Sequence, residues 1–173
     1  MCIVIDMNTI PCVFNETNEK HSEFKPVKDW IINGKGKMVY GGNTYLNELK
    51  KMQKYLKFIN ILKSARKIID CSEKMEKIDE KEHYLTQKID NPDFDDPHIV
   101  AILIVSGCQL VCSDDKRAYP YLTKSDWYSS AKVVPKIYSR LKNKNLLHDN
   151  NIADVCKPSQ RLSKREKDSF GLS

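Results

Sequence analysis

Long hydrophobic runs are absent from this sequence. No apolar stretch approaches the roughly 18 residues that a membrane-spanning helix needs. The N-terminus also lacks the basic start and the longer apolar stretch of a secretory signal, because Asp6 directly follows the short run Cys2-Ile3-Val4-Ile5. We therefore expect a cytoplasmic protein with no membrane partner.

Pairs of cysteines in the CxxC spacing are also absent, although the chain has six cysteines. A structural zinc site usually needs such pairs, and Cys108 and Cys112 fall on either side of a predicted helix-to-strand junction. In a reducing cytosol most of these cysteines are expected to be small buried hydrophobic residues. We therefore expect neither a zinc knuckle nor a disulfide framework.

Internal repeats and low-complexity tracts are missing too, and 40% of the 173 residues are hydrophobic. This length and composition suit one globular domain that buries a core without disulfides or metals. From about Lys157 the chain is polar and charged, with almost no large apolar residue. We expect one domain over residues 1–156 and a basic, mobile tail over residues 157–173.

Charge is distributed unevenly along the chain. Residues 116–173 contain 13 Lys and Arg against 5 Asp and Glu, whereas residues 1–115 contain 16 against 18. A basic region beside an acidic one suits a protein that acts on a phosphate polymer, because Lys and Arg bind the polymer backbone. A solvated basic surface would give the same pattern, so charge alone leaves both interpretations open.

The apolar patterning predicts an α/β fold, in which helices cover both faces of a mostly parallel sheet in a three-layer α/β/α sandwich. Strands are expected at residues 2–6, 38–40, 109–113 and 136–138, and a short edge strand or an extended connection at residues 67–71. Helices are expected at residues 21–33, 43–62, 72–88 and 96–106, with shorter ones near 119–122 and 142–147. The helix at 96–106 is apolar nearly all round and should be the most buried.

Acidic residues that are far apart in the sequence lie at the ends or on the inner turns of hydrophobic elements: Asp6, Glu48, Asp96, Asp114 and Asp115. A carboxylate at the carboxyl edge of a strand in an open α/β sheet points into the crevice where such sheets bind ligands. Two unit charges about 4 Å apart repel by roughly 4 kcal/mol at an effective dielectric of about 20, so several carboxylates there favour a bound cation. Any one of these acids alone is also typical of a turn former, a helix cap or a solvated helix residue.

The predicted site suits Mg²⁺ or Mn²⁺, which take oxygen ligands and keep several waters. Such an ion activates a water molecule for attack on a phosphodiester and stabilises charge on the scissile phosphate. Asn8 and Ser113 are expected to orient the phosphate or the carboxylates, as substrate-binding residues. His98 is more typical of a packed or capping residue than of a ligand, and His21 of a surface position.

Four short segments resemble motifs of the PIN domain, the fold of the VapC-type toxin ribonucleases and related nucleases: Asp6-Met7-Asn8, Glu48-Leu49, Asp96-Pro97-His98 and Ser113-Asp114-Asp115. The resemblance covers roughly residues 1–140. It implies that Asp6, Glu48, Asp96 and Asp115 are catalytic and bind one or two Mg²⁺ or Mn²⁺ ions. Asp114 is the alternative fourth ligand, although the Ser-x-Asp spacing favours Asp115.

The resemblance further implies a metal-dependent endoribonuclease that hydrolyses RNA, acting as the toxin of a toxin–antitoxin or phage-defence pair. Its expected partners are RNA, an antitoxin or defence-system protein, and a second copy of the chain in a homodimer. A PIN-like scaffold that binds RNA or a protein without catalysis is the main alternative. A phosphoacceptor receiver domain also clusters acids on a parallel sheet, but Glu48 and Asp96 fall on helices here.

Overall fold

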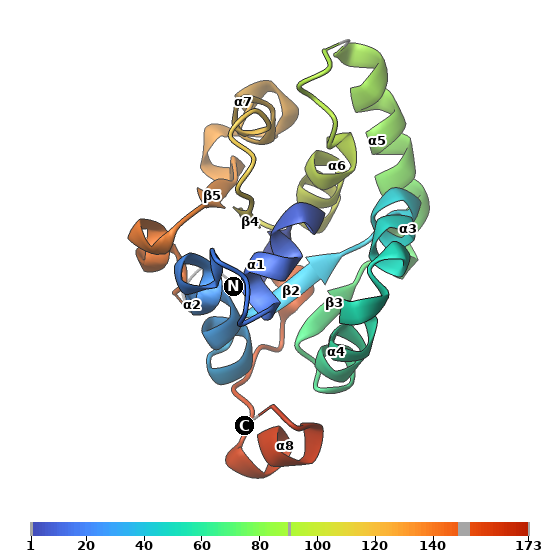
Figure 1. Cartoon of the computed structure of the whole chain (residues 1–173). Coiled ribbons are helices and arrows are strands. Elements are labelled where there is room, and N and C mark those ends of the chain that lie inside the picture. The colour runs from blue at the N-terminus through green and yellow to red at the C-terminus, as the bar shows by residue number, and fades with distance from the viewer. Residues whose placement is uncertain (1, 90, 149–152, 173) are drawn as a thin grey trace.

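The centre of the molecule is a five-stranded, all-parallel sheet with the strand order β3-β2-β1-β4-β5 (Figure 1). The computed structural model describes residues 2–89, 91–148 and 153–172. The strands are β1 (Cys2–Ile5), β2 (Lys37–Tyr40), β3 (Ile68–Asp70), β4 (Leu110–Cys112) and β5 (Lys136–Tyr138). All five lie where the apolar patterning predicts them.

Helices connect the strands and cover the sheet, so the predicted three-layer α/β/α architecture is confirmed. The α-helices are α1 (Ile10–Phe14), α2 (His21–Asn33), α3 (Asn43–Lys51), α4 (Gln53–Ser64), α5 (Met75–Lys88), α6 (Pro97–Ser106), α7 (Tyr119–Leu122) and α8 (Lys164–Phe170). Short 3₁₀ turns lie between several of them, at Met7–Thr9, Ser72–Lys74, Ser125–Trp127, Ala131–Val133, Leu141–Leu146 and Asp154–Cys156. No helix in the described ranges is long and apolar enough to cross a membrane.

The direction of winding reverses at β1, which pairs with β2 on one side and β4 on the other. Right-handed crossovers therefore place α2, α3 and α4 on one face of the sheet and α5 and α6 on the other. In such a sheet the ligand crevice opens outside the carboxyl ends of the strands at the reversal. Backbone hydrogen bonds from Asp6 N to Cys112 O (2.9 Å) and from Ser113 N to Tyr138 O (3.1 Å) extend the ladder into this crevice.

Helix α6 is the most deeply buried helix, as its sequence predicts. Its residues Ile99–Leu103 are at most 1% exposed, and it packs against α5, α3 and β1. Pro97 begins this helix and Gly107 ends it in the left-handed conformation, with a φ of 70°. Burial of this helix fixes the position of Asp96, its N-cap residue.

The single helix predicted over residues 43–62 is wrong, because the chain leaves the helical conformation at Met52, with φ −88° and ψ 53°. Leu49 and Leu62 are both buried, at 4% and 0% exposure. A straight helix with 3.6 residues per turn would place these two leucines on different sides. The break between α3 and α4 lets both side chains enter the core.

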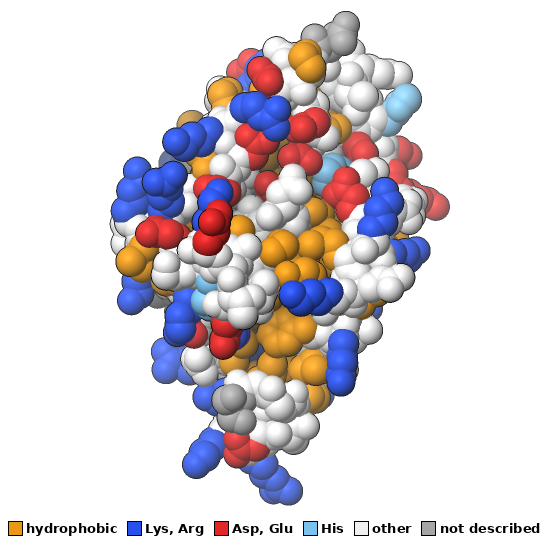
Figure 2. All heavy atoms as spheres, viewed as in Figure 1, with side chains coloured by type: hydrophobic (Ala, Val, Ile, Leu, Met, Phe, Trp, Pro, Cys, Tyr) orange, Lys and Arg blue, Asp and Glu red, His pale blue; other side chains and the backbone are white. Residues whose placement is uncertain are grey.

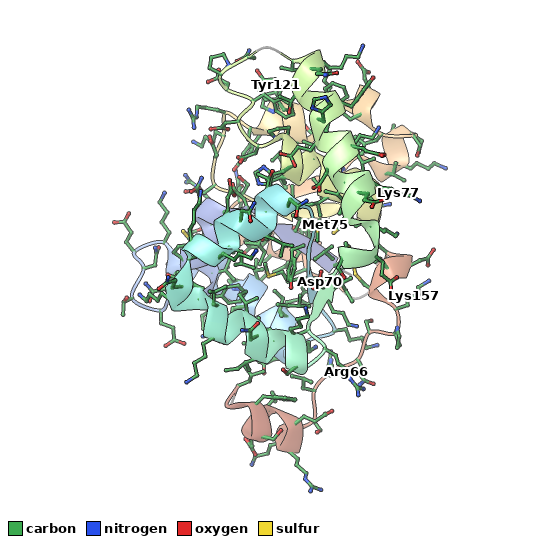
Figure 3. The ribbon with its side chains drawn as sticks, turned by 90° about the vertical axis from the view of Figure 1, so that its right-hand side faces the viewer. Arg66, Asp70, Met75, Lys77, Tyr121 and Lys157 are labelled. Carbon is green, nitrogen blue, oxygen red and sulfur yellow. A yellow bond between two sulfur atoms is a disulfide. The ribbon has the colours of Figure 1, made fainter. Side chains whose placement is uncertain are left out.

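The sequence predicts a mobile tail over residues 157–173, and the part of this segment that the structure describes, which ends at Leu172, contains the helix α8. The chain runs from Lys157 past Arg66 to α8 at the end of the molecule opposite α7 (Figures 1 and 3). Ser163 and Glu166 form a capping box at the start of α8, each side chain accepting a hydrogen bond from the backbone of the other. This local signal was overlooked because the segment is so polar.

Two buried lysines hold this C-terminal segment against the amino edge of the sheet. Lys37 Nζ donates to Pro158 O at 2.8 Å, and Lys67 Nζ donates to Gln160 O at 3.0 Å and to Gly34 O at 2.8 Å. Lys37 is 6% exposed and Lys67 only 1%. A buried ammonium group must have hydrogen-bond acceptors, and the tail backbone supplies them.

Cys2 and Cys156 are joined by a disulfide, with their Cα atoms 6.3 Å apart, which corrects the expectation that no disulfide forms. The four remaining cysteines are free and buried: Cys12, Cys71, Cys108 and Cys112. The two bonded residues are 154 positions apart. Spacing therefore carried no signal of this pairing.

Candidate active site

Asp6 lies directly after β1 and is only 3% exposed. Its Oδ1 accepts a hydrogen bond from Asn8 N at 3.1 Å, and its Oδ2 accepts one from Ser113 Oγ at 2.8 Å. Burial raises the pKa of Asp6, and these two hydrogen bonds act in the opposite direction. The ends of β1 and β4 are thus tied together through one carboxylate.

Glu48 projects from α3 and is partly exposed. The start of α3 is fixed by α5, because Asp79 Oδ1 accepts a hydrogen bond from Asn43 N at 2.8 Å. Burial raises the pKa of Glu48, Lys51 lowers it, and the charge of Asp6 raises it further. The position of α3 therefore brings Glu48 into the electrostatic field of Asp6.

Asp96 is the N-cap residue directly before α6, but within the described residues its side chain makes no capping hydrogen bond to the helix. Its pKa is raised to about 7, first by burial and then by nearby negative charges, among them those of Asp6, Asp95 and Glu48. Asp115 contributes as well. The structure therefore brings Asp6, Glu48, Asp96 and Asp115 into one group, which we call the acid cluster.

His98 lies between two members of the acid cluster and is 2% exposed. Its Nε2 atom is 3.4 Å from Glu48 Oε2 and 4.0 Å from Asp96 Oδ1, yet it makes no hydrogen bond to any described residue. Burial lowers the pKa of His98 to about 4, so the ring is neutral and forms no ion pair. The ring packs on Tyr45, with centroids 6.2 Å apart, as expected for a packed histidine.

A second histidine, His21, does not lie at the surface as predicted. His21 is 8% exposed rather than at the surface, and its Nδ1 lies 3.0 Å from Cys12 O. It begins α2 and packs toward α1. Polar neighbours in the sequence concealed this packing, because the apolar contacts come from another element.

Asp114 and Asp115 point to different partners. Asp115 accepts hydrogen bonds from Arg117 Nη2 at 2.8 Å and from Arg117 Nε at 3.2 Å, and these hydrogen bonds lower the pKa of Asp115. Its backbone N donates to Ser113 Oγ at 3.1 Å, which also holds Asp6. Asp114 Oδ2 instead accepts from Lys20 Nζ at 2.6 Å. The structure thus groups Asp115 with the other acids and turns Asp114 toward Lys20.

Three charged residues of the site were missed from the sequence. Asp95 raises the pKa of both Asp6 and Asp96, and it lies 3.8 Å from Arg117 Nη2. Lys51 stands one helical turn after Glu48 on the same face of α3. The available signals were the doublet Asp95-Asp96, this i,i+3 spacing, and the position of Arg117 two residues after Asp115.

A pocket of about 310 Å³ opens beside the acid cluster. Its lining combines two acids with apolar and polar side chains: Met7, Asn8, Pro11, Glu48, Lys51, Met52 and Asp96. Of the predicted site residues, the pocket thus gathers Asn8, Glu48 and Asp96. Asp6 and Ser113 lie behind it, at the strand ends.

The acid cluster has the donor chemistry of a site for a hard cation, since all its side-chain donors are carboxylate oxygens. Across the described ranges, however, no three His, Cys, Asp or Glu side chains are already gathered closely enough to hold a metal ion. Asp6 is hydrogen-bonded to Ser113 and Asp115 to Arg117, and mutual repulsion opposes closer approach. The types of ligand atom therefore suit Mg²⁺ or Mn²⁺, and the metal site itself stays a prediction.

A basic surface lies on the same side of the molecule as the acids. Figure 2 shows acidic side chains gathered near the upper centre of one face, with many Lys and Arg side chains at its left. Residues 116–144 supply eight exposed basic residues: Lys116, Arg117, Lys124, Lys132, Lys136, Arg140, Lys142 and Lys144. Asp126 is the one acid in this stretch.

Comparison with models of known families, with curated proteins and with solved structures found no match for this chain. The function must therefore be argued from the site itself.

Proposed function

We propose that this protein is a metal-dependent endoribonuclease. One observation carries the proposal: at the winding reversal of the sheet, Asp6 is 3% exposed and the pKa of Asp96 is raised to about 7 by burial and surrounding carboxylates. Like charges concentrated in a buried site reduce the stability of the fold. Strongly shifted carboxylates in a ligand crevice are typical of functional sites.

The bound ion would be Mg²⁺ or Mn²⁺, held by Asp6, Glu48, Asp96 and Asp115. When bound, such an ion supplies activation of a water molecule and stabilisation of charge on the scissile phosphate. Asp114 is not part of this proposed set, because its carboxylate is paired with Lys20.

The protein's own groups have separate tasks in this proposal. Ser113 fixes the rotamer of Asp6 through its 2.8 Å hydrogen bond, and the packed ring of His98 keeps solvent away from one side of Glu48. Lys51 at the pocket and Arg117 beside Asp115 are placed to bind phosphate oxygens of the substrate. Arg117 would exchange part of its contact with Asp115 for the substrate.

The exposed basic residues at positions 116–144 support a polymeric phosphate substrate, because Arg117 contacts Asp115 of the acid cluster and Lys and Arg side chains lie beside acids on this face (Figure 2). We propose RNA as this polymer because the four acidic segments resemble motifs of PIN-domain ribonucleases. The same resemblance supports a role in a toxin–antitoxin or phage-defence pair in the cytoplasm, with a protein partner that neutralises the enzyme.

The test is cleavage of end-labelled single-stranded and hairpin RNA by the purified chain in Mn²⁺, compared with its Asp6→Asn variant. We expect Asp6→Asn to cleave RNA at least about a hundred-fold more slowly than the parent chain. Mutating a group that only orients a metal ligand already lowers metal affinity or activity by about 10–100-fold. Mn²⁺ should raise the melting temperature of the parent chain more than that of the variant, since only a ligand of the folded state stabilises it.

Asp114→Asn is the matched control, because it removes a neighbouring carboxylate that faces Lys20 instead of the acid cluster. It should cleave at close to the parent rate. RNA binding without cleavage by the parent chain would favour the scaffold alternative, and equal rates for the parent and Asp6→Asn would refute the proposal.

A further inference from the structure

The lining of the pocket beside the acid cluster combines two kinds of side chain. Glu48 and Asp96 are its acids, and Met7, Pro11 and Met52 are its apolar residues, which together we call the apolar wall. Lys51 and Asn8 are exposed at its rim. On this face, hydrophobic side chains lie directly beside the gathered acids (Figure 2). Metal binding and phosphate binding use the charged groups and leave the apolar wall without a role.

Two irregular backbone segments build this apolar wall. The helix break at Met52 ends α3 directly after Lys51, so that both residues border the pocket. The second segment is the 3₁₀ turn Met7–Thr9, which follows Asp6 and leads to Pro11 in the first turn of α1. The pocket therefore depends on the same two elements that position Asp6 and Glu48.

We propose that this pocket holds one unpaired nucleobase of the RNA, next to the phosphate that is cleaved; this inference rests on the proposed endoribonuclease function. A volume of about 310 Å³ is at the lower end of the range for small-ligand pockets, which suits a single base. Methionine thioethers make favourable contacts with aromatic rings, and Met7 and Met52 line the same wall. A paired base is stacked within its helix and cannot enter, so the substrate is single-stranded.

The polar rim suits the rest of a nucleotide. The Asn8 side-chain amide carries both hydrogen-bond donors and an acceptor, which match the mixed donor and acceptor edge of a base. The ammonium group of Lys51 is a partner for a backbone phosphate. A free anionic ligand without a base would meet Glu48 and Asp96 and gain nothing from the apolar wall.

The direct test uses methyl resonances, because the chain has five methionines and only Met7 and Met52 line the pocket. A single-stranded RNA oligonucleotide is added to the parent chain in EDTA, where cleavage does not complicate binding. The methyl signals of Met7 and Met52 should move upfield by ring current, whereas those of Met38 and Met75 should not. The same oligonucleotide with abasic riboses should leave all four in place.

A cleavage measurement gives an independent readout. Replacing the nucleotides around the cleaved bond one at a time by abasic ribose should raise KM at one position only. Met52→Ala should raise KM for the intact substrate by about two- to ten-fold, as expected for losing one sulfur–aromatic contact, and should remove most of the penalty of that abasic position. Met75→Ala is the control outside the pocket.

The two proposals fail in different ways. A parent chain that cleaves RNA but shows no methyl shift and no position-specific abasic effect would overturn the nucleobase pocket and leave the nuclease intact. Methyl shifts from the intact oligonucleotide, without cleavage in Mn²⁺, would support the base-binding pocket and refute the endoribonuclease function. Equal shifts from the intact and abasic oligonucleotides would overturn the pocket as a base-binding site.

Discussion

At the scale of single residues, burial shifts two neighbouring groups of the site in opposite directions. It raises the pKa of Asp96 to about 7 and lowers the pKa of His98 to about 4, because it disfavours the charged form of each. At pH values between about 4 and about 7, both side chains are therefore neutral. The site therefore carries less charge in weakly acidic solution than its count of ionisable residues suggests.

The raised pKa of Asp96 makes stability depend on pH. A carboxyl group whose pKa is higher in the folded state contributes stability that is present below its unfolded value, near 3.8, and is lost as pH rises through about 7. In metal-free buffer, Asp96→Asn should match the parent chain only below about pH 4, where the carboxyl group is protonated in both states, and should exceed it increasingly toward pH 7.5. Thermal unfolding measures this, with roughly 2–4 °C expected for each kcal/mol in a chain of this size.

Asp93→Asn is the control for this prediction, since Asp93 is an exposed carboxylate of the same loop. It should shift the melting temperature little at any pH. A gain from Asp96→Asn that stayed constant from pH 5 to pH 7.5 would show that the carboxyl group does not titrate in this range.

At the scale of elements, the position of Glu48 depends on a close approach between α3 and α5. Gly42 precedes α3 with φ 80° and ψ 150°, a conformation essentially restricted to glycine. A Cβ atom at Gly42 would also lie 2.7 Å from Ile78 Cγ2, and Ile78 is fully buried. The start of α3 therefore has little freedom to move away from α5.

Gly42→Ala should destabilise the fold by about 1–3 kcal/mol, because it forces a strained backbone and displaces α3 from α5. It should also lower nuclease activity in the folded protein, since α3 carries Glu48. Denaturant unfolding and initial cleavage rates measure the two effects. Gly107→Ala is the matched control, because Gly107 also has a positive φ of 70° but has open space around its missing Cβ. If Gly42→Ala kept the cleavage rate of the parent chain, the function of Glu48 would not depend on the orientation of α3.

Elements with a strong local signal could be predicted from the sequence, and those decided by distant contacts could not. The apolar run of α6, bounded by Pro97 and Gly107, marks a buried helix unambiguously. The break at Met52 has no such mark, because it results from the separate burial of Leu49 and Leu62. In the site, Asp6 and Asp96 could be placed by the ends of their elements. The orientation of Asp114 depends on Lys20, which is 94 positions away in the sequence, so no local pattern connects the two residues.

At the scale of the whole molecule, the two edges of the parallel sheet carry different groups. The acid cluster lies beyond the carboxyl ends of β1 and β4, whereas Lys37 begins β2 and binds the C-terminal segment at the amino edge. The disulfide between Cys2 and Cys156 lies at this amino edge as well, at the first residue of β1. The C-terminal segment therefore stabilises the fold at a distance from the proposed substrate site.

Truncation after Cys156 should consequently lower stability without changing the chemistry. It removes the carbonyl acceptors of Lys37 and Lys67, and hydrogen bonds to charged groups contribute about 1.5–3 kcal/mol each. Truncation after Leu162 is the matched comparison, because it removes α8 but retains the acceptors Pro158 O and Gln160 O. It should lower the free energy of unfolding by less. Denaturant unfolding ranks the stabilities of the parent and the two truncated chains. At a temperature where all three are folded, their cleavage rates should be equal. A rate that fell with either truncation would place the C-terminal segment in the substrate site, and equal stability of the two truncated chains would show that the lysine contacts do not hold the fold together.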